Sequence, residues 1–250
     1  MNICALKCKI AELDVLIRVL NPDCRVISQS RSYLYDFSGS PQIEIGFDSD
    51  FLENRHIEFP SVPICEHEYI WTGYDFGKKL LPYDGFLLHA SAVAYKGRAY
   101  LFSAPCGTGK STHTSIWQRV FGSEAVIIND DKPALRLIGE KVYVYGTPWS
   151  GKTDKNKNVK VPLGGVCFIE RCRENHIETA DKKSAVNMIM SQTLRIPYPK
   201  TMEALLNVLG RALPHIPVFT MGCNMEDDAA ICAYEYMSKF AGEGDVSYEN

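Results

Sequence analysis

The chain has 250 residues, of which 46% are hydrophobic and 23% charged, and its formal net charge is −3. That length can bury a full core and fits one large α/β domain, alone or with a small appendage. Because both charge signs are interspersed, the composition offers no basic patch for nucleic acid or anionic membrane. No run approaches the roughly 18 apolar residues of a membrane span, and the start lacks the pattern of a secretion signal. We therefore expect a soluble, cytoplasmic protein that binds neither nucleic acid nor membrane.

The first 80 residues predict a small β-rich N-terminal portion. Polar and apolar residues alternate over 3–10, 15–19 and 42–47, which indicates strands, and Pro- and Gly-containing breaks fall at 21–22 and 38–41. The segment 66–79 carries Tyr69, Trp71, Tyr74 and Phe76 and fits either a connecting helix or a packed linker. The sequence leaves these two alternatives open.

Residues 81–250 predict an α/β core. Strands are expected over 86–93, 99–102, 126–128, 166–169 and 218–221, together with a hairpin over 133–137 and 142–145 around Gly139. Helices are expected over 110–120, 180–194, 200–213 and 226–240.

A glycine-rich segment between the strand at 99–102 and the helix at 110–120 predicts a phosphate-binding loop. Its sequence, APCGTGKST over 104–112, fits G-x-x-x-x-G-K-[ST] except that Ala104 replaces the first glycine. Glycines let such a loop turn its N–H groups toward phosphate oxygens at the positive end of a helix. The expected nucleotide contacts are Cys106, Gly107, Thr108, Gly109, Lys110, Ser111 and Thr112, with Lys110 at the β/γ-phosphates and Ser111 on Mg²⁺. The alternative is a β-to-α turn that matches by chance.

The cysteines do not form a metal or disulfide framework. There are nine, none in a C-x-x-C pair, which favours reduced thiols that fill apolar space. Cys106 differs because it lies before a helix N-terminus, where a thiol gains reactivity. A spacer role, in which only its backbone matters, is the other interpretation.

Asp130 and Asp131 follow the strand at 126–128, at the edge of an α/β sheet where ligands bind. Of two such carboxylates, one can hold Mg²⁺ while the other accepts a proton from an attacking hydroxyl. The alternative is a solvated turn at the end of the strand. In the strand expected over 86–93, His89 and Ser91 point to the same side, so both can face the phosphates.

A lysine-rich stretch over 152–160 indicates a mobile lid whose cations close over the transferred phosphoryl group, with Lys152 the best candidate and Gly151 its hinge. An ordinary solvated loop is equally compatible with such a charge run. Trp149 either stacks on a ligand or anchors this loop by packing, and His113 and Trp117 are read as packing residues. The acidic residues 226–228 are expected to favour a helix N-terminus rather than to bind metal.

Three motifs together resemble the catalytic core shared by HPr kinase/phosphorylase and ATP-dependent phosphoenolpyruvate carboxykinase: 88–92 (LHASA), 104–111 (APCGTGKS) and 129–131 (NDD). The resemblance implies a P-loop core with a mixed sheet. It also implies that His89 lies near metal or phosphate, that Lys110 and Ser111 bind phosphate and metal, and that Asp130 and Asp131 serve metal binding and proton transfer. We take Asp131 with Ser111 as the metal ligands and Asp130 as the base, an assignment that the sequence alone leaves open.

The stretches 111–117 and 146–152 further resemble HPr-kinase-related proteins found beside genes for modified peptides. The N-terminal domain that assembles the HPr kinase oligomer is not recognisable, and the chain is too short for a full carboxykinase. We therefore expect a kinase that uses ATP and Mg²⁺ to phosphorylate a hydroxyl of a peptide, a protein or a small alcohol. The alternatives are an ATP-binding regulatory module without turnover and a carboxykinase-like lyase. Oligomeric state is left open, a homo-oligomer included.

Overall fold

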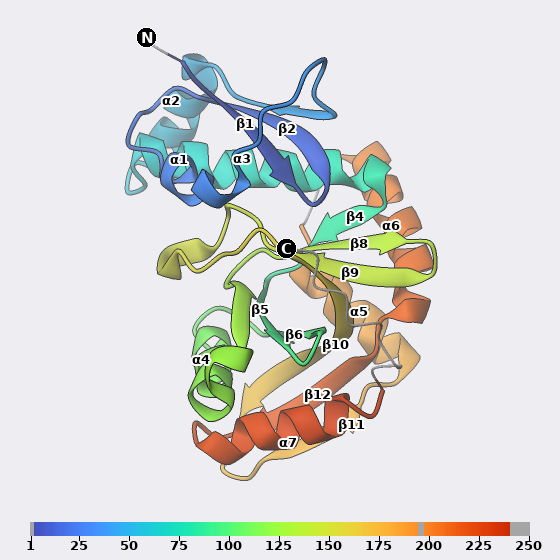
Figure 1. Ribbon diagram of the computed structural model, residues 1–250. Coiled ribbons are helices and arrows are strands. Elements are labelled where there is room, and N and C mark those ends of the chain that lie inside the picture. Colours follow the sequence, from blue (N-terminus) through green and yellow to red (C-terminus); the bar gives the residue numbers. More distant parts are fainter. Residues whose placement is uncertain (1–2, 195–197, 241–250) are drawn as a thin grey trace.

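The computed structural model describes residues 3–194 and 198–240, which form a small N-terminal sheet above a larger, curled mixed sheet (Figure 1). In the small sheet, β1 (Cys4–Ile10) and β2 (Leu13–Val19) pair antiparallel, and β3 (Ile43–Ile45) lies parallel to β2. Ala11 and Glu12, which join β1 to β2, both take positive φ values, 51° and 65°. Such a two-residue turn matches the twist of a hairpin.

Helices cover one side of the small sheet. They are α1 (Arg25–Gln29), α2 (Ser49–Glu58) and α3 (Ile64–Leu80), with a short 3₁₀ turn at Arg31–Tyr33. Asp48 begins α2 by accepting a hydrogen bond from the backbone N–H of Phe51 at 2.8 Å. α3 contains the segment 66–79, for which the sequence left a helix or a packed linker open. The segment is thus a helix, and it runs between the two sheets (Figure 1). The sequence did not predict α1 or α2.

The larger sheet has the strand order β4-β8-β9-β10-β6-β5-β7, and β12 and then β11 extend it beyond β10. β6, β10 and β12 run parallel to one another, and the remaining neighbours pair antiparallel. The expected α/β class with a mixed sheet is confirmed. The strands are β4 (Gly85–Leu87), β5 (Ala90–Tyr95), β6 (Arg98–Ser103), β7 (Val126–Asn129), β8 (Ala134–Ile138), β9 (Lys141–Tyr145), β10 (Lys160–Arg171), β11 (His176–Thr179) and β12 (Val218–Cys223).

The single strand expected over 86–93 is wrong, because the chain there crosses from one part of the sheet to another. β4 pairs with β8, whereas β5 pairs with β6 and β7. Leu88 and His89 lie between the two strands, and the backbone N–H of His89 donates to the carbonyl of Gln192 at 2.9 Å. His89 therefore does not share a strand with Ser91.

β10 is much longer than the strand expected over 166–169, and its two halves pair with different strands. Its first residues pair with β9, and its second half lies between β6 and β12. The pairing with β6 shifts register between Leu163 and Gly165. A Cβ on Gly164 would lie 2.8 Å from Cε1 of Tyr100, so a glycine permits this close approach.

Four further helices complete the core. α4 (Lys110–Phe121) packs against α7 (Asp227–Met237), and α5 (Lys182–Gln192) and α6 (Pro199–Ala212) each contribute apolar residues to the cluster of the larger sheet. α4 and α7 bury an aromatic cluster that includes Tyr100, Phe102 and Trp117. A separate cluster joins apolar residues of the N-terminal sheet to Leu87 and Trp149 of the larger part. Residues on both sides of the predicted boundary between 80 and 81 thus share one cluster, and the boundary itself stays a prediction.

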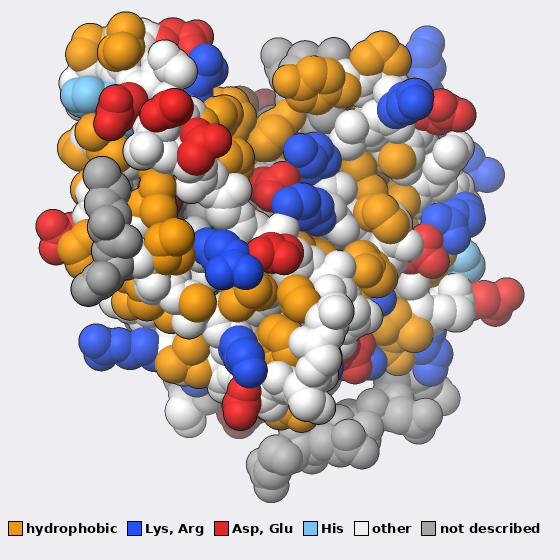
Figure 2. Space-filling model, turned by 90° about the horizontal axis from the view of Figure 1, so that it is seen from above, with side chains coloured by type: hydrophobic (Ala, Val, Ile, Leu, Met, Phe, Trp, Pro, Cys, Tyr) orange, Lys and Arg blue, Asp and Glu red, His pale blue; other side chains and the backbone are white. Residues whose placement is uncertain are grey.

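On the face seen from above the small sheet, side chains of both charge signs are interspersed with apolar ones (Figure 2). Among the described residues, no helix combines the length and the apolar character needed to cross a bilayer.

Candidate functional site

The glycine-rich loop joins β6 to α4, as the sequence predicted. Gly107 and Gly109 have φ values of +81° and +124°, which side-chain-bearing residues rarely adopt. Ala104 takes none of these positive φ values, so the loop tolerates it in place of the first glycine. The local geometry is that of a turn feeding a helix N-terminus, where backbone N–H groups are available to an anion.

Lys110 is folded back onto this loop. Its Nζ donates to the carbonyl of Ala104 at 2.9 Å and, more weakly, to that of Pro105 at 3.4 Å. Burial lowers the pKa of Lys110, while Cys106, Asp131 and Asp130 oppose that effect by favouring the charged form. The ammonium group therefore lies within the electrostatic field of both carboxylates.

Asp130 is buried and held by hydroxyl groups from separate elements. Its Oδ1 accepts from Ser91 Oγ of β5 at 2.5 Å, and its Oδ2 accepts from Thr153 Oγ1 at 2.7 Å. Ser91 Oγ also lies 2.7 Å from Thr114 Oγ1 of α4. These contacts fix the direction of the Asp130 carboxylate.

Asp131 has different neighbours and is more accessible, with 24% of its side chain exposed. Its Oδ2 accepts from Lys132 Nζ at 2.7 Å, and its Oδ1 lies 3.5 Å from Nε2 of His89. Burial first, and then Lys110, lowers the pKa of His89 against the opposing effect of Asp131. His89 Nδ1 lies 3.0 Å from Gln192 Oε1, and its Nε2 faces Oδ1 of Asp131, so the ring is held between an amide and a carboxylate. A neutral His89 with its proton on Nδ1 would present the Nε2 lone pair to a metal beside Asp131.

Asn129 shapes the turn that carries both carboxylates. Its Oδ1 accepts from the backbone N–H groups of Asp131 and Lys132 at 3.0 and 2.7 Å. Its Nδ2 donates to the carbonyl of Thr147 at 2.9 Å. An Asn side chain that accepts from the backbone N–H two residues later forms an Asx turn, which is common at the ends of strands. The position of Asn129 directly before the Asp pair was the sequence feature that could have indicated this turn.

The segment 146–160 lies against both the carboxylates and the N-terminal helices. It contains a short 3₁₀ turn, Gly151–Thr153, and a Cβ on Gly151 would lie 2.9 Å from the Cβ of Asp131. Arg25 of α1 donates to the carbonyl of Gly151 at 2.8 Å, and Gln29 donates to Asp154. Lys152 itself is exposed, and its proposed action on a phosphoryl group stays a prediction.

Trp149, His113 and Trp117 are packing residues, as the sequence favoured. The Trp149 ring stacks on Phe76 at a centroid distance of 4.9 Å, and its Nε1 donates to Thr72 Oγ1 at 3.2 Å. Trp117 Nε1 donates to His113 Nε2 at 3.3 Å. The acidic residues at 226–228 lie at the start of α7, where Asp227 pairs with Arg119.

Sequence reasoning missed Arg171, at the end of β10. Its Nη2 donates to the carbonyl of Gly107 at 2.9 Å and its Nε to that of Thr108 at 3.2 Å. These bonds tie the glycine-rich loop to the neighbouring strand. No local pattern marks this residue, because its role depends on β10 lying beside β6.

Asp131 is the carboxylate of the pair that a metal could reach, because 24% of its side chain is exposed and it lies beside His89. Among the described residues, no group of three or more His, Cys, Asp or Glu is arranged to hold a metal. Mg²⁺ usually takes one or two carboxylates plus substrate phosphates and keeps several waters. Asp131 and the Ser111 hydroxyl would supply that kind of partial set.

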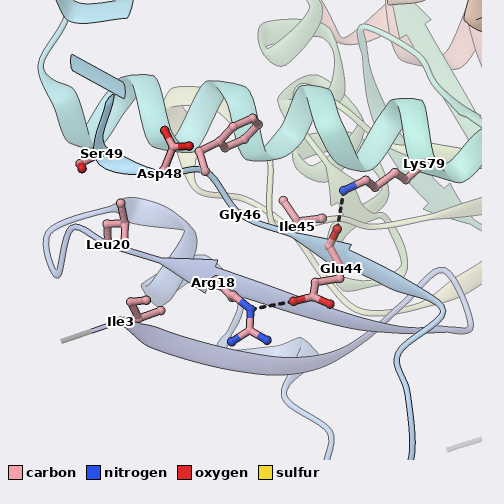
Figure 3. Close-up of a pocket in the computed structure, with 10 residues that line it drawn as sticks. Ile3, Arg18, Leu20, Glu44, Ile45, Gly46, Asp48, Ser49 and Lys79 are labelled. Carbon is pink, nitrogen blue, oxygen red and sulfur yellow. Dashed lines mark hydrogen bonds and ion pairs between the residues drawn. The ribbon is translucent and has the colours of Figure 1, made fainter. Parts of the chain in front are cut away.

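Two hollows lie elsewhere. One, of about 800 Å³, lies against the small sheet and is lined by Arg18, Glu44, Lys79 and neighbouring apolar side chains (Figure 3). Arg18 Nε of β2 donates to Glu44 Oε1 of the neighbouring β3 at 2.7 Å, in the wall of this hollow. The other, of about 470 Å³, lies between the end of α4 and residues 154–157. Neither is lined by the loop, by His89 or by the Asp pair.

Comparison with protein-family models and with curated protein sequences finds no match. Among solved structures, the chain is similar to the HPr(Ser) kinase/phosphatase from Coxiella burnetii at 10% sequence identity and a TM-score of 0.35. The match covers 62% of this chain and 99% of that one. A similarity this low does not place the chain in that protein's family.

Proposed function

We propose that this chain is an ATP- and Mg²⁺-dependent phosphotransferase that moves the γ-phosphoryl group to a hydroxyl, the Ser or Thr of a peptide or protein. The observation that carries the proposal is that the glycine-rich loop and Asp130 meet at the first turns of α4. Asp130 accepts from Ser91 Oγ, which lies 2.7 Å from Thr114 Oγ1 of α4, and the loop that feeds this helix contains two glycines with positive φ values, as phosphate-binding loops do.

The loop and Lys110 would hold the phosphates. Lys110 Nζ would exchange its bonds to the carbonyls of Ala104 and Pro105 for bonds to the β- and γ-phosphate oxygens. Ser111 and Asp131 would hold Mg²⁺, which supplies charge neutralisation of the triphosphate.

Asp130 would act on the acceptor. In the transfer, the acceptor oxygen forms a bond to the γ-phosphorus, the bond from that phosphorus to the β-γ bridging oxygen breaks, and ADP leaves. The hydroxyl proton passes to a carboxylate oxygen of Asp130, which Ser91 and Thr153 already hold in a fixed direction. His89, neutral beside Asp131, would ligate the metal through the lone pair of Nε2.

Thermal unfolding with and without MgATP tests the binding half of the proposal. A ligand at about 100 times its Kd should add about 2.7 kcal/mol to the free energy of unfolding, because it binds only the folded state. The Lys110→Ala variant should lose this gain, and Lys141→Ala, an exposed lysine on β9, should keep it. An unchanged melting curve for the parent at millimolar MgATP would contradict the proposal.

Transfer itself is tested by following labelled γ-phosphate from ATP into peptides that contain Ser or Thr. Label in a Ser or Thr phosphoester is the expected result. Binding of MgATP without transfer or hydrolysis would favour a regulatory module. Release of CO₂ from oxaloacetate together with conversion of ATP to ADP would favour a carboxykinase-like lyase.

A further inference from the structure

The strand order places different strands on the two sides of the glycine-rich loop. β6, which leads into the loop, lies between β5 and β10. Beyond β5 comes β7, which ends at the Asp130–Asp131 pair, and beyond β10 comes β12. Because β6, β10 and β12 are parallel, their carboxyl ends meet at the same edge, the edge where ligands of α/β sheets bind.

This arrangement gives a bound nucleotide a direction. A triphosphate chain is linear, so its γ end and its nucleoside lie on opposite sides of the loop. If the γ-phosphate lies beside Asp130 and Asp131, on the β7 side, the nucleoside extends over the carboxyl ends of β10 and β12.

Two exposed side chains of suitable chemistry lie at those ends. Arg171 ends β10, and its guanidinium is anchored by the carbonyls of Gly107 and Thr108. Met225 follows β12 and is 42% exposed, yet its Cε would lie only 2.8 Å from a Cβ on Gly109. Both side chains thus touch the loop and also reach solvent.

The loop that carries Met225 is itself braced. The backbone N–H of Asn224 donates to Asn175 Oδ1 at 2.9 Å, and Asn175 Nδ2 donates to Asn224 Oδ1 at 3.2 Å. This reciprocal pair joins the turn after β10 to the turn after β12, so that Arg171 and Met225 are carried by one connected surface.

We propose that Arg171 and Met225 form the nucleoside site, with the planar base lying against the Met225 thioether and the face of the Arg171 guanidinium. This inference rests on the proposed function, because it needs the triphosphate in the glycine-rich loop. Guanidinium planes and thioethers both pack well on aromatic rings. Arg171 has a second role as a positioning residue, since its bonds to the Gly107 and Thr108 carbonyls hold the loop.

Calorimetric titration with two probes, MgATP and Mg-tripolyphosphate, tests the inference, because only ATP carries a base. Met225→Ala should raise the Kd for MgATP about tenfold, in line with a base-stacking contribution of about 1–3 kcal/mol. The Kd for tripolyphosphate should stay within about twofold of the parent. Leu206→Ala, an exposed apolar residue of α6, is the matched control and should change neither.

Arg171 gives a second, independent readout. Arg171→Ala should weaken both probes, because the loop loses its two carbonyl restraints. Arg171→Lys keeps the charge and a donor but not the plane, so it should regain tripolyphosphate binding while MgATP stays weakened. Unliganded melting temperatures equal to that of the parent show that the variants fold.

The outcomes separate the two proposals. If the parent binds neither probe, the proposed function fails. If the parent binds both with equal affinity, or if Met225→Ala and Arg171→Lys change both to the same extent, the phosphate site stands and the nucleoside lies elsewhere.

Discussion

Asp130 and Asp131 are adjacent in the chain but meet different surroundings. Asp130 is 6% exposed and receives a hydroxyl hydrogen bond at each carboxylate oxygen. Asp131 faces Lys132 and His89, and a larger part of its side chain reaches solvent. The accessible carboxylate suits a metal that arrives with its nucleotide, and the fixed one suits a proton acceptor.

Asp130→Asn should therefore lower turnover by a factor of about 10² to 10⁴, the usual contribution of a general base, while MgATP still binds. Asp131→Asn should weaken nucleotide binding in a Mg²⁺-dependent way as well, because a metal ligand acts in the ground state too. Titrating Mg²⁺ against each variant, with turnover measured in parallel, distinguishes them. If both variants bind and turn over like the parent, the pair has only a structural role at the end of β7.

His113 makes a pH prediction. It is 1% exposed, its Nδ1 has no hydrogen-bond partner, and burial lowers its pKa to about 4. The unfolded chain binds this proton near pH 6.5, so the folded state loses stability as the pH falls from about 6.5 to about 4. The full effect on the free energy of unfolding is about 3 kcal/mol.

Urea unfolding measured at several pH values checks this. His113→Gln should flatten the dependence in that pH window, whereas His215→Gln, which changes an exposed histidine, should leave it as in the parent. A slope that survives His113→Gln would assign the effect to other groups.

At the scale of elements, the segment 146–160 is better anchored than its lysine content indicates. Thr153 bonds to Asp130, and Arg25 bonds to the carbonyl of Gly151, so contacts with two different parts of the molecule flank Lys152. If Lys152 moves toward a phosphoryl group, we expect its side chain or the short 3₁₀ turn that carries it to move, and the rest of the segment to stay in place.

Lys152→Ala should lower turnover at least about tenfold and change the Kd for MgATP less than about twofold, because a cation that meets the migrating phosphoryl group acts chiefly in the transition state. Lys155→Ala, in the same exposed stretch, is the matched control and should keep parental turnover. Equal turnover in both variants would make this segment an ordinary solvated loop.

Patterns within single segments predicted the elements around the glycine-rich loop well. The apolar run before it and the start of α4 at Lys110 follow from alternation and from loop chemistry. The break between β4 and β5 was missed because apolar residues continue through Leu88 while the pairing partner changes. Arg171 and Met225 were missed because their position depends on the order of strands, which no local pattern contains.

On the scale of the whole molecule, α3 links the N-terminal sheet to the segment that flanks the candidate site. Gly73 of α3 lies against Trp149, and a Cβ there would lie 2.7 Å from Cδ1 of that ring. Trp149 in turn packs on Phe76 and precedes the turn at Gly151–Thr153 by two residues, so α3 holds the chain just before that turn.

Gly73→Ala should reduce the free energy of unfolding by about 1–3 kcal/mol, since the added methyl overpacks a filled interior. Gly210→Ala in α6 is the matched control, because a Cβ there meets nothing within 4 Å. It should add about 0.5–1 kcal/mol, as expected for alanine in a helix. Urea unfolding of both variants measures the difference in the free energy of unfolding. Equal values for Gly73→Ala and Gly210→Ala would mean that the space around Trp149 can accommodate the added methyl group.

The two-part pairing of β10 also limits which insertions and deletions the gene can tolerate. Side chains of a strand alternate between its faces, so adding or removing one residue in its second half would turn Arg171 away from the carbonyls of Gly107 and Thr108. The hairpin turn between β8 and β9 has no such restriction, because it is exposed and a Cβ on Gly139 would meet nothing within 4 Å. Over evolutionary time, we expect length changes to accumulate at that turn and to be purged from β10, so that the spacing from Gly165 to Arg171 stays constant.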